Sequence, residues 1–238
     1  VVFNQNQKTN QTTFTMTLST PSSDTNFKTY QLKGGQYSDW IDTTETTTFN
    51  FTLTQQGANI LSIRGKDFAG NTGNVASVTI SLDSVSPVLS EINVSPTITT
   101  ATIAWKTSEP TTGQVDFGLN QDYGSSQVDS IFKNSHTVLL TGLSSNTIYH
   151  YRITSIDNVG NTTISTDLTF TTLEKIAKIS GGGIHTCAVT ISGKIKCWGW
   201  NSSGQLGDET TTNRLIPVDV VNLSSGVNDI EVGENHTC

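Results

Sequence analysis

The sequence predicts an all-β protein, in which two tandem antiparallel β-sandwiches are followed by about one blade of an incomplete β-propeller. The first observation is composition: 40 of the 238 residues are Thr and 26 are Ser, whereas Met occurs once, and this favours pleated strands over helices. The second is that apolar and polar residues alternate in short runs separated by turn residues. The third is a Gly- and Trp-rich stretch near the end that begins to repeat itself after 51 residues.

Charge and hydropathy exclude two classes of partner. The chain has 13 basic and 20 acidic residues and a net charge of −7. It therefore lacks the basic surface by which proteins bind nucleic acid, and we expect no nucleic-acid partner. No run of about 18 apolar residues occurs, so we expect no membrane insertion in this segment.

Residues 1–83 predict the first sandwich. Apolar side chains alternate with polar ones in four runs, which is the pattern of antiparallel strands that bury one face. Turn residues, including Gly34-Gly35 and Gln56-Gly57, separate the runs. The runs are Phe14–Leu18, Phe49–Leu53, Leu61–Ile63 and Val78–Leu82.

Residues 84–172 predict the second sandwich by the same alternation. The boundary lies at residues 83–87, where Pro87 cannot donate to a strand ladder and biases Ser86 to extended geometry. A short, stiff connection is therefore expected. The alternating apolar residues are Ile103 and Trp105, Val115 and Phe117, Val138 and Leu140, Tyr149 to Ile153, and Leu168 and Phe170.

Both units contain the motif D-x-x-G-N. It occupies residues 67–71 and 157–161, so the two copies lie 90 residues apart. Gly tolerates a positive φ, and an Asp side chain can accept from its own downstream backbone, so both copies predict hairpin tips. A repeat at the spacing of one sandwich indicates tandem modules.

Residues 173–238 predict a propeller blade and the start of a second. Ile184-His185-Thr186-Cys187 recurs as Asn235-His236-Thr237-Cys238. A period of about 40–50 residues with Gly, Trp and short strands is typical of propeller blades. The chain begins at Val1 without a leader pattern and ends inside the second copy of the motif, so we interpret it as a piece of a longer polypeptide.

The spacing of two cysteines predicts a cross-strand disulfide. Residues 186–190 and 194–198 read as strands joined by Ile191-Ser192-Gly193, a three-residue hairpin loop with Gly193 in the left-handed region. This register opposes Cys187 to Cys197 at a separation close to disulfide range. Two alternatives remain open: a pair of buried free thiols, and a zinc site of His185 with both cysteines, which lacks a fourth ligand.

The second unit resembles a fibronectin type III domain. Trp105 and the run Leu143-Ser144-Ser145-Asn146-Thr147-Ile148-Tyr149 resemble the family signature L-x-P-x-T-x-Y, with Ser145 where Pro is usual. The resemblance implies that Tyr149 is a tyrosine corner, whose hydroxyl bonds to backbone a few residues upstream. Val115–Gly118, followed by His136–Leu140, is also similar to the non-catalytic N-terminal domain of purple acid phosphatases.

Two further resemblances cover the ends of the chain. The first unit resembles bacterial immunoglobulin-like surface modules through Trp40, the tip at residues 67–71 and the closing Leu82-Asp83. Residues 197–208 fit the pattern W-G-x-N-x-x-G-Q-L-G of the regulator of chromosome condensation repeat, whose full form is a seven-bladed propeller. These resemblances imply modules found in large secreted bacterial surface proteins.

The sequence contains no motif for catalysis, cofactor binding or metal binding. It has no G-x-S-x-G, P-loop or H-E-x-x-H pattern, and Gly181–Gly183 is not followed by a helical pattern. His136 and His150 are expected on neighbouring strands with structural roles. His185 and His236 occupy the same repeat position and are expected to pack within the blade. We therefore predict no catalytic, cofactor-binding or metal residues, no cofactor, and a protein that is not an enzyme.

Two hypotheses about specific ligands remain open. Calcium could bind near module ends, where oxygen ligands gather, although hairpin turns explain the same residues. The residues concerned are Asp67, Asn71, Asp83, Asp157 and Asn161. A carbohydrate could stack on Tyr37, Trp40 or Tyr123, although single aromatics near turns usually cover the edge of a core.

We interpret the chain as a non-catalytic extracellular spacer and adhesion region of a larger secreted or cell-surface bacterial protein. The two sandwiches would hold the blade away from an anchor, and a protein or glycan ligand would bind at the propeller or loop surfaces. The alternative is an accessory region of a secreted hydrolase, phosphatase-like or carbohydrate-active, whose catalytic domain lies outside residues 1–238.

Overall fold

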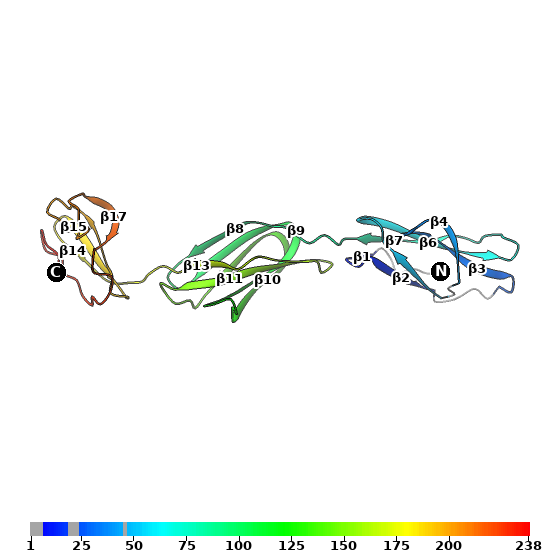
Figure 1. Cartoon of the computed structure of the whole chain (residues 1–238), viewed down its shortest axis with the longest axis horizontal. Coiled ribbons are helices and arrows are strands. Elements are labelled where there is room, and N and C mark those ends of the chain that lie inside the picture. Colours follow the sequence, from blue (N-terminus) through cyan, green and yellow to red (C-terminus); the bar gives the residue numbers. More distant parts are fainter. Residues whose placement is uncertain (1–6, 19–23, 45–46) are drawn as a thin grey trace.

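The computed structural model describes residues 7–18, 24–44 and 47–238, which form strands β1 to β17. No helix occurs in these described ranges, and none of their segments qualifies as a membrane-spanning helix. Figure 1 shows three bodies in a row, with β1–β7 at one end, β8–β13 in the middle and the remaining strands at the other end. The chain is all-β, as the sequence predicts: two sandwiches followed by part of a propeller.

The N-terminal sandwich, strands β1–β7, packs a large mixed sheet against a small one. Residues Met16, Phe49 and Phe51 from the small sheet meet Leu61, Ile63 and Ile80 from the large one in a shared core. The large sheet has the order β1(Gln7–Thr9), β7(Ala76–Leu82), β6(Gly57–Asp67), β3(Phe27–Gly34), β4(Tyr37–Thr43), and the small sheet pairs β2(Thr13–Thr17) with β5(Thr48–Thr52).

One pairing corrects the expectation of a purely antiparallel sandwich. β1 pairs with β7 in parallel, with Gln7 opposite Ile80 and Thr9 opposite Leu82. After β1 the chain crosses to the small sheet to form β2. β1 and β7 therefore run in the same direction at this edge of the large sheet.

The middle sandwich, strands β8–β13, is built around one long hairpin. β9(Ala101–Gly118) and β10(Ser125–Leu140) pair along most of their length, with register shifts between Asp129 and Ser135. The apolar runs around Trp105 and Val115 therefore lie on one continuous strand. β9 also pairs with β8(Leu89–Pro96) and with β11(Ile148–Asp157), and β11 pairs with β12(Thr162–Ile164) and β13(Leu168–Thr171).

Trp105 lies at the centre of this sandwich. Its indole stacks on His136 with ring centroids 4.9 Å apart, and its Nε1 donates to the Ser155 hydroxyl at 3.1 Å. The backbone of β9 approaches so closely that a Cβ on Gly113 would lie 2.4 Å from the indole. Glycine at this position therefore leaves room for a large buried aromatic side chain.

The tyrosine corner implied by the resemblance is present. The backbone N–H of Ser144 donates to the Tyr149 hydroxyl at 2.9 Å, and the Tyr149 ring stacks on Phe170. The bond ties the loop before β11 to the core.

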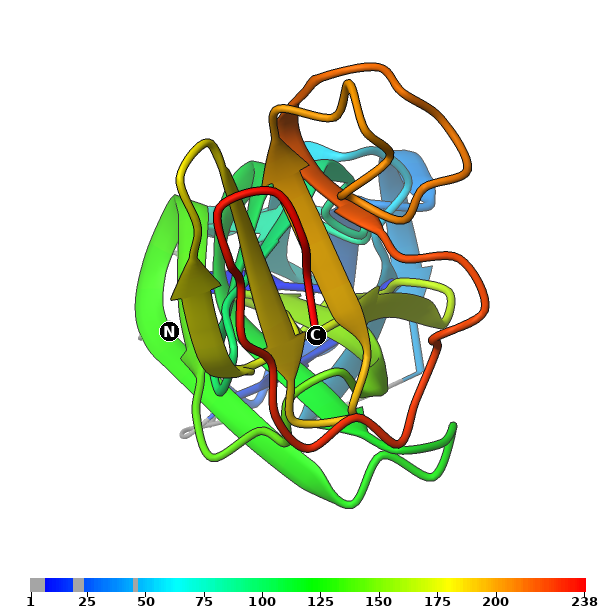
Figure 2. The same cartoon turned by 90° about the vertical axis from the view of Figure 1, so that its left-hand side faces the viewer.

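The third body, called the blade here, has four antiparallel strands. They are β14(Ile176–Gly181), β15(His185–Thr190), β16(Ile195–Gly199) and β17(Arg214–Asp219), in that order. Figure 2 shows the C-terminal segment, in red, crossing in front of these strands. Val227, Ile230 and Val232 of this segment cover a core formed by both cysteines, Val189, Ile195 and Leu206.

Replacing Tyr149 by Phe tests the tyrosine corner. The variant loses one partly buried hydrogen bond, so the free energy of unfolding of the middle sandwich should fall by about 1 kcal/mol. In differential scanning calorimetry one transition should move down by about 5 °C.

Tyr151→Phe is the matched control for this experiment. Tyr151 is a buried tyrosine on the same strand, and its hydroxyl makes no hydrogen bond within the part of the chain that the structure describes. Equal shifts in the two variants would contradict a special role for Tyr149.

Candidate functional site

Polar and reactive side chains gather at three places: the disulfide face of the blade, the junction between the two sandwiches, and the surface around Tyr123.

The β15–β16 hairpin brings the two cysteines together as its turn predicts. Gly193 has a φ of +79°, and the N–H of Thr190 donates to the carbonyl of Lys194 at 2.9 Å. Cys187 then lies opposite Cys197, and the two are joined in a disulfide. The disulfide prediction is confirmed, and both sulfurs are buried in the blade core.

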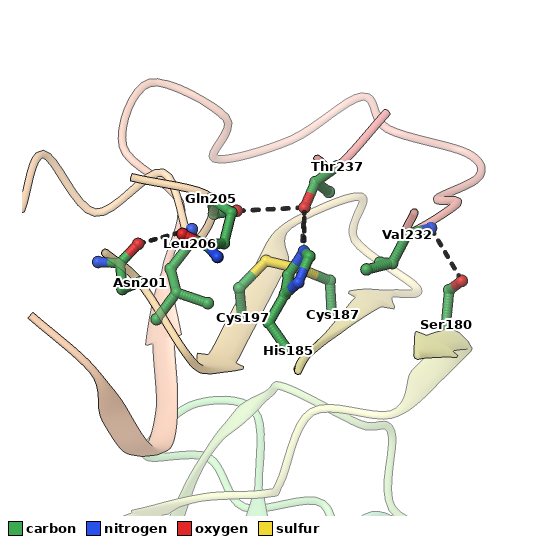
Figure 3. The surroundings of a disulfide bond; sticks show 9 residues. All are labelled: Ser180, His185, Cys187, Cys197, Asn201, Gln205, Leu206, Val232 and Thr237. Atoms are coloured by element: carbon green, nitrogen blue, oxygen red, sulfur yellow. Dashed lines mark hydrogen bonds between the residues drawn. A yellow bond between two sulfur atoms is a disulfide. The ribbon is translucent and has the colours of Figure 1, made fainter. Parts of the chain in front are cut away.

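The second copy of the His-Thr-Cys motif docks beside this disulfide (Figure 3). The Thr237 hydroxyl donates to the carbonyl of Gln205 at 3.1 Å, so the His185 Nε2, at 2.9 Å, must be the donor to Thr237. Burial, and then the charge of His236, lower the pKa of His185, which agrees with a neutral ring. The start of one repeat therefore anchors to the histidine of the repeat before it.

Asn201 organises the loop that follows β16. Its buried side chain donates to the Asp208 carboxylate and to the carbonyls of Thr210 and Thr212, and it accepts from the N–H of Leu206 at 2.9 Å. Burial alone would raise the pKa of Asp208, but hydrogen bonds from Thr210, Arg214 and Asn201 lower it to about 2. The repeat pattern includes Asn201, and Asp208 directly follows it, but the pattern does not reveal this structural role.

The junction between the sandwiches brings three carboxylates together. Oxygens of Asp83, Glu109 and Asp157 all lie within 4.8 Å of one another. Asp157 is buried and accepts from the N–H groups of Val159, Gly160 and Asn161.

The calcium hypothesis included Asp83 and Asp157 but missed Glu109, which lies where β9 bends from its pairing with β8 at Thr107 to its pairing with β11 at Thr111. Of the other three expected ligands, Asp67 and Asn71 lie at the tip of the N-terminal sandwich, where they bond to each other. Asp157 performs the same tip-closing role with Asn161. Hairpin closure therefore explains both tips, and among the residues that the structure describes it is the junction that offers three carboxylates close enough to meet one cation.

The three aromatic residues considered for carbohydrate binding have different surroundings. Tyr37 packs edge-on against Phe51, and the Arg64 guanidinium covers the ring of Trp40 at 4.1 Å. Tyr123, in contrast, lines two hollows in the surface of the middle sandwich.

The two histidines of the middle sandwich are both tied to aspartates. His136 is buried and contacts Asp129 at 3.1 Å, and His150 contacts Asp167 at 2.8 Å. The expectation that they lie on neighbouring strands is wrong, because β9 runs between β10 and β11. The long β9 strand, which alternation alone did not reveal, causes this difference.

Comparison with known families agrees with the second and third bodies. Residues 89–172 match the purple acid phosphatase N-terminal domain. Two descriptions of the regulator of chromosome condensation (RCC1) repeat match residues 176–205 and 192–238.

Curated relatives match short stretches of the chain. The chain is 47% identical over 45 residues to the ultraviolet-B receptor UVR8 of Arabidopsis thaliana, covering 19% of this chain and 10% of the receptor. It is 38% identical over 63 residues to the probable E3 ubiquitin-protein ligase HERC3 of Homo sapiens, covering 26% of this chain and 6% of the ligase. The chain thus spans about a tenth or less of the length of these relatives.

Solved structures resemble the sandwich array. Domains A168–A170 of titin align with a TM-score of 0.51 at 14% identity, covering 71% of this chain and 62% of that one. The FN1–FN3 domains of chicken CNTN1 align with a TM-score of 0.41 at 15% identity, covering 72% and 66%. The chain is a tandem β-sandwich array followed by a region that matches the RCC1 repeat, in the order immunoglobulin-like, fibronectin type III-like, RCC1-like.

Replacing Glu109 by Gln tests the carboxylate junction through pH. Burial, and then the charges of Asp83 and Asp157, raise the pKa of Glu109. A carboxyl group whose pKa is raised by folding destabilises the fold once pH exceeds that pKa, and the penalty vanishes below the unfolded value. Glu109→Gln should therefore raise the melting temperature by about 2–4 °C at pH 7 and by much less at pH 4.

The matched control is Glu91→Gln, which removes an exposed carboxylate paired with Lys106 on the neighbouring strand. This change should alter stability by less than about 0.5 kcal/mol. A Glu109→Gln effect of the same size at both pH values would show that carboxylate repulsion is not its cause.

Proposed function

We propose that the chain is a non-catalytic spacer and binding region of a larger secreted or cell-surface bacterial protein, with units at residues 1–83, 84–172 and 173–238. The observation that carries this proposal is the linear order of three separately cored bodies, with the blade at one end (Figure 1). The disulfide supports an oxidising compartment, because such bonds persist mainly outside the cytosol.

Hydrogen bonds along both linkers support the spacer role. The N–H of Asp83 donates to Thr9, and the Asn161 side chain donates to the carbonyl of Asp83 at 2.8 Å. Thr163 donates to the carbonyl of Pro87. The first linker is therefore bonded to the sandwich on each side of it.

The second linker is tied in the same way. The N–H of Leu173 donates to Thr97 in the middle sandwich, and the carbonyl of Lys175 accepts from Ile191 in the blade. A Ser192 hydroxyl also donates to Glu174. Short linkers with partners on both sides resist bending, which a spacer needs.

The binding role is supported by apolar side chains on the outer strand of the blade. Leu215 is 97% exposed and Ile216 is 72% exposed, and both lie on β17 at the edge of the sheet. Consecutive residues of a strand point to opposite faces of the sheet, so the two side chains present apolar surface on both faces of this outer strand. A protein or glycan partner would bind here, at the end of the spacer.

The alternative, an accessory region of a secreted hydrolase, is favoured by one observation. Residues 89–172 match a domain named for its place in purple acid phosphatases. Catalysis would then reside in sequence beyond residues 1–238.

A double substitution on β17 tests the binding role. The purified chain is passed over immobilised collagen, fibronectin, laminin and mucin in biolayer interferometry, and p-nitrophenyl phosphate hydrolysis is assayed in parallel. We expect saturable binding to at least one surface, reduced about tenfold or more in Leu215→Asp/Ile216→Asp, because buried apolar area is lost. No hydrolysis is expected.

Val128→Asp/Ile131→Asp is the control, since it places the same charges at exposed apolar positions on β10. Equal losses in both double variants, or hydrolysis by the purified chain, would contradict the proposal.

A further inference from the structure

Tyr123 lies between two adjacent hollows on the middle sandwich. It belongs to the loop 119–124, which joins the ends of β9 and β10. One hollow has a volume of about 350 Å³ and the other about 310 Å³. Tyr123, Gly124 and Ser125 line both of them, so the two hollows are direct neighbours that share a wall.

The two hollows differ in chemistry. The larger one is lined by planar polar groups, and the smaller one combines apolar side chains with the polar side chains of Ser125 and Thr141 and with glycine backbone. The polar lining comes from Gln114, Asp116, Asp122, Ser126 and Arg152, and the apolar lining from Phe117, Leu119, Leu143 and Tyr149.

The tyrosine is held in place before any ligand arrives. Its hydroxyl donates to Asp167 at 3.1 Å, and the Arg152 guanidinium lies 4.8 Å from the ring centroid. Asp167 is itself fixed by His150 and Gln121. Burial, and then the bond to Asp167, raise the pKa of Tyr123, so the phenol remains a donor at neutral pH.

The backbone of the loop is fixed as well. The N–H of Tyr123 donates to the carbonyl of Asn120 at 3.1 Å. A Cβ on Gly118 would lie 1.6 Å from the Tyr123 carbonyl oxygen, so the loop packs against β9 without space between them. A ligand that binds here meets a preorganised surface and loses little affinity to loop ordering.

The charges in the polar hollow favour a neutral ligand. Arg152 donates to Asp116 at 2.9 Å, and Gln114 donates to the other Asp116 oxygen at 2.6 Å, so the one cation is already neutralised. Asp122 adds a negative charge at the rim. An anionic ligand would be repelled, and a cation would have to displace the bound guanidinium.

A ligand must therefore offer neutral hydroxyl groups on one side and an apolar face on the other. Amide, carboxylate and guanidinium edges each accept or donate two parallel hydrogen bonds, which suits pairs of adjacent hydroxyls. Aromatic and aliphatic side chains suit the C–H face of a ring. Sugar rings carry both kinds of surface, and both volumes fall at the lower end of ligand sites, about 300–1,000 Å³.

We propose that the double hollow around Tyr123 binds a neutral carbohydrate chain, with one sugar over the polar half and its neighbour over the apolar half. This rests on the proposed binding function and adds to it a second site, remote from β17. A protein partner is a different outcome, since a stable protein interface needs about 1,000 Å² or more of buried surface.

The test uses the full 238-residue chain labelled with ¹⁵N. Cellohexaose, chitohexaose, maltohexaose and xylohexaose are titrated separately, and hexagalacturonic acid serves as the charged probe. We expect at least one neutral oligosaccharide to shift the signals of residues 114–126 in a saturable way, with a dissociation constant of about 0.1–1 mM. The charged probe should cause no such shift.

Two variants locate the site. Tyr123→Asn removes the ring and keeps a residue that tolerates the φ of +61° at this position. Gln114→Leu removes hydrogen bonding from the polar half and keeps the size of the side chain. Each should weaken binding about five- to tenfold or more.

Phe132→Ala is the matched control, because Phe132 is an exposed aromatic on the same sandwich that lines neither hollow. The affinity of this variant for the oligosaccharide should equal that of the unaltered chain. The Leu215→Asp/Ile216→Asp variant should also keep this affinity. The proposal is overturned if no neutral oligosaccharide binds, or if Tyr123→Asn and Gln114→Leu bind as the unaltered chain does. Loss of binding only in the β17 variant would support the blade surface and refute the Tyr123 site.

Discussion

Each sheet in this chain has one apolar face that must be covered, and that requirement shapes the whole molecule. The N-terminal sandwich packs two sheets around Phe49 and Phe51, and in the middle sandwich the single sheet folds over Trp105, because β9 pairs with β8 along its first part and with β11 along its second. The blade has only one sheet, so it recruits the segment that contains Val227, Ile230 and Val232 as a cover. Three separate cores result, and none depends on apolar contact with another.

Because the cores are separate, hydrogen bonds connect the bodies. Asn161 closes its own hairpin tip and also holds the first linker at Asp83. The equivalent tip of the N-terminal sandwich closes in the same way through Asp67 and Asn71. The D-x-x-G-N motif therefore closes a hairpin tip in both sandwiches. In the middle sandwich it also holds the linker that joins the two. The carboxylates that accompany this connection make its stability depend on pH.

Features that depend on residues close together along the chain were predictable from the sequence. The hairpin turn at Gly193 sets the register that opposes Cys187 to Cys197, and the corner at Tyr149 depends on a hydroxyl reaching back five residues. The approach of Glu109 to Asp157 depends instead on where β9 bends, and alternation alone does not fix the bend. The hollow at Tyr123 likewise combines side chains from β9, β11 and a loop, so its lining follows from strand order rather than from any local pattern.

Small-angle X-ray scattering of the 238-residue chain tests the end-to-end arrangement most directly. A single compact body of this length would have a radius of gyration of about 18 Å. Three bodies in a row, each about 30–40 Å long, should give about 30–35 Å and a distance distribution with a long tail. A value near 18 Å would show that the bodies fold back on one another and would contradict the account.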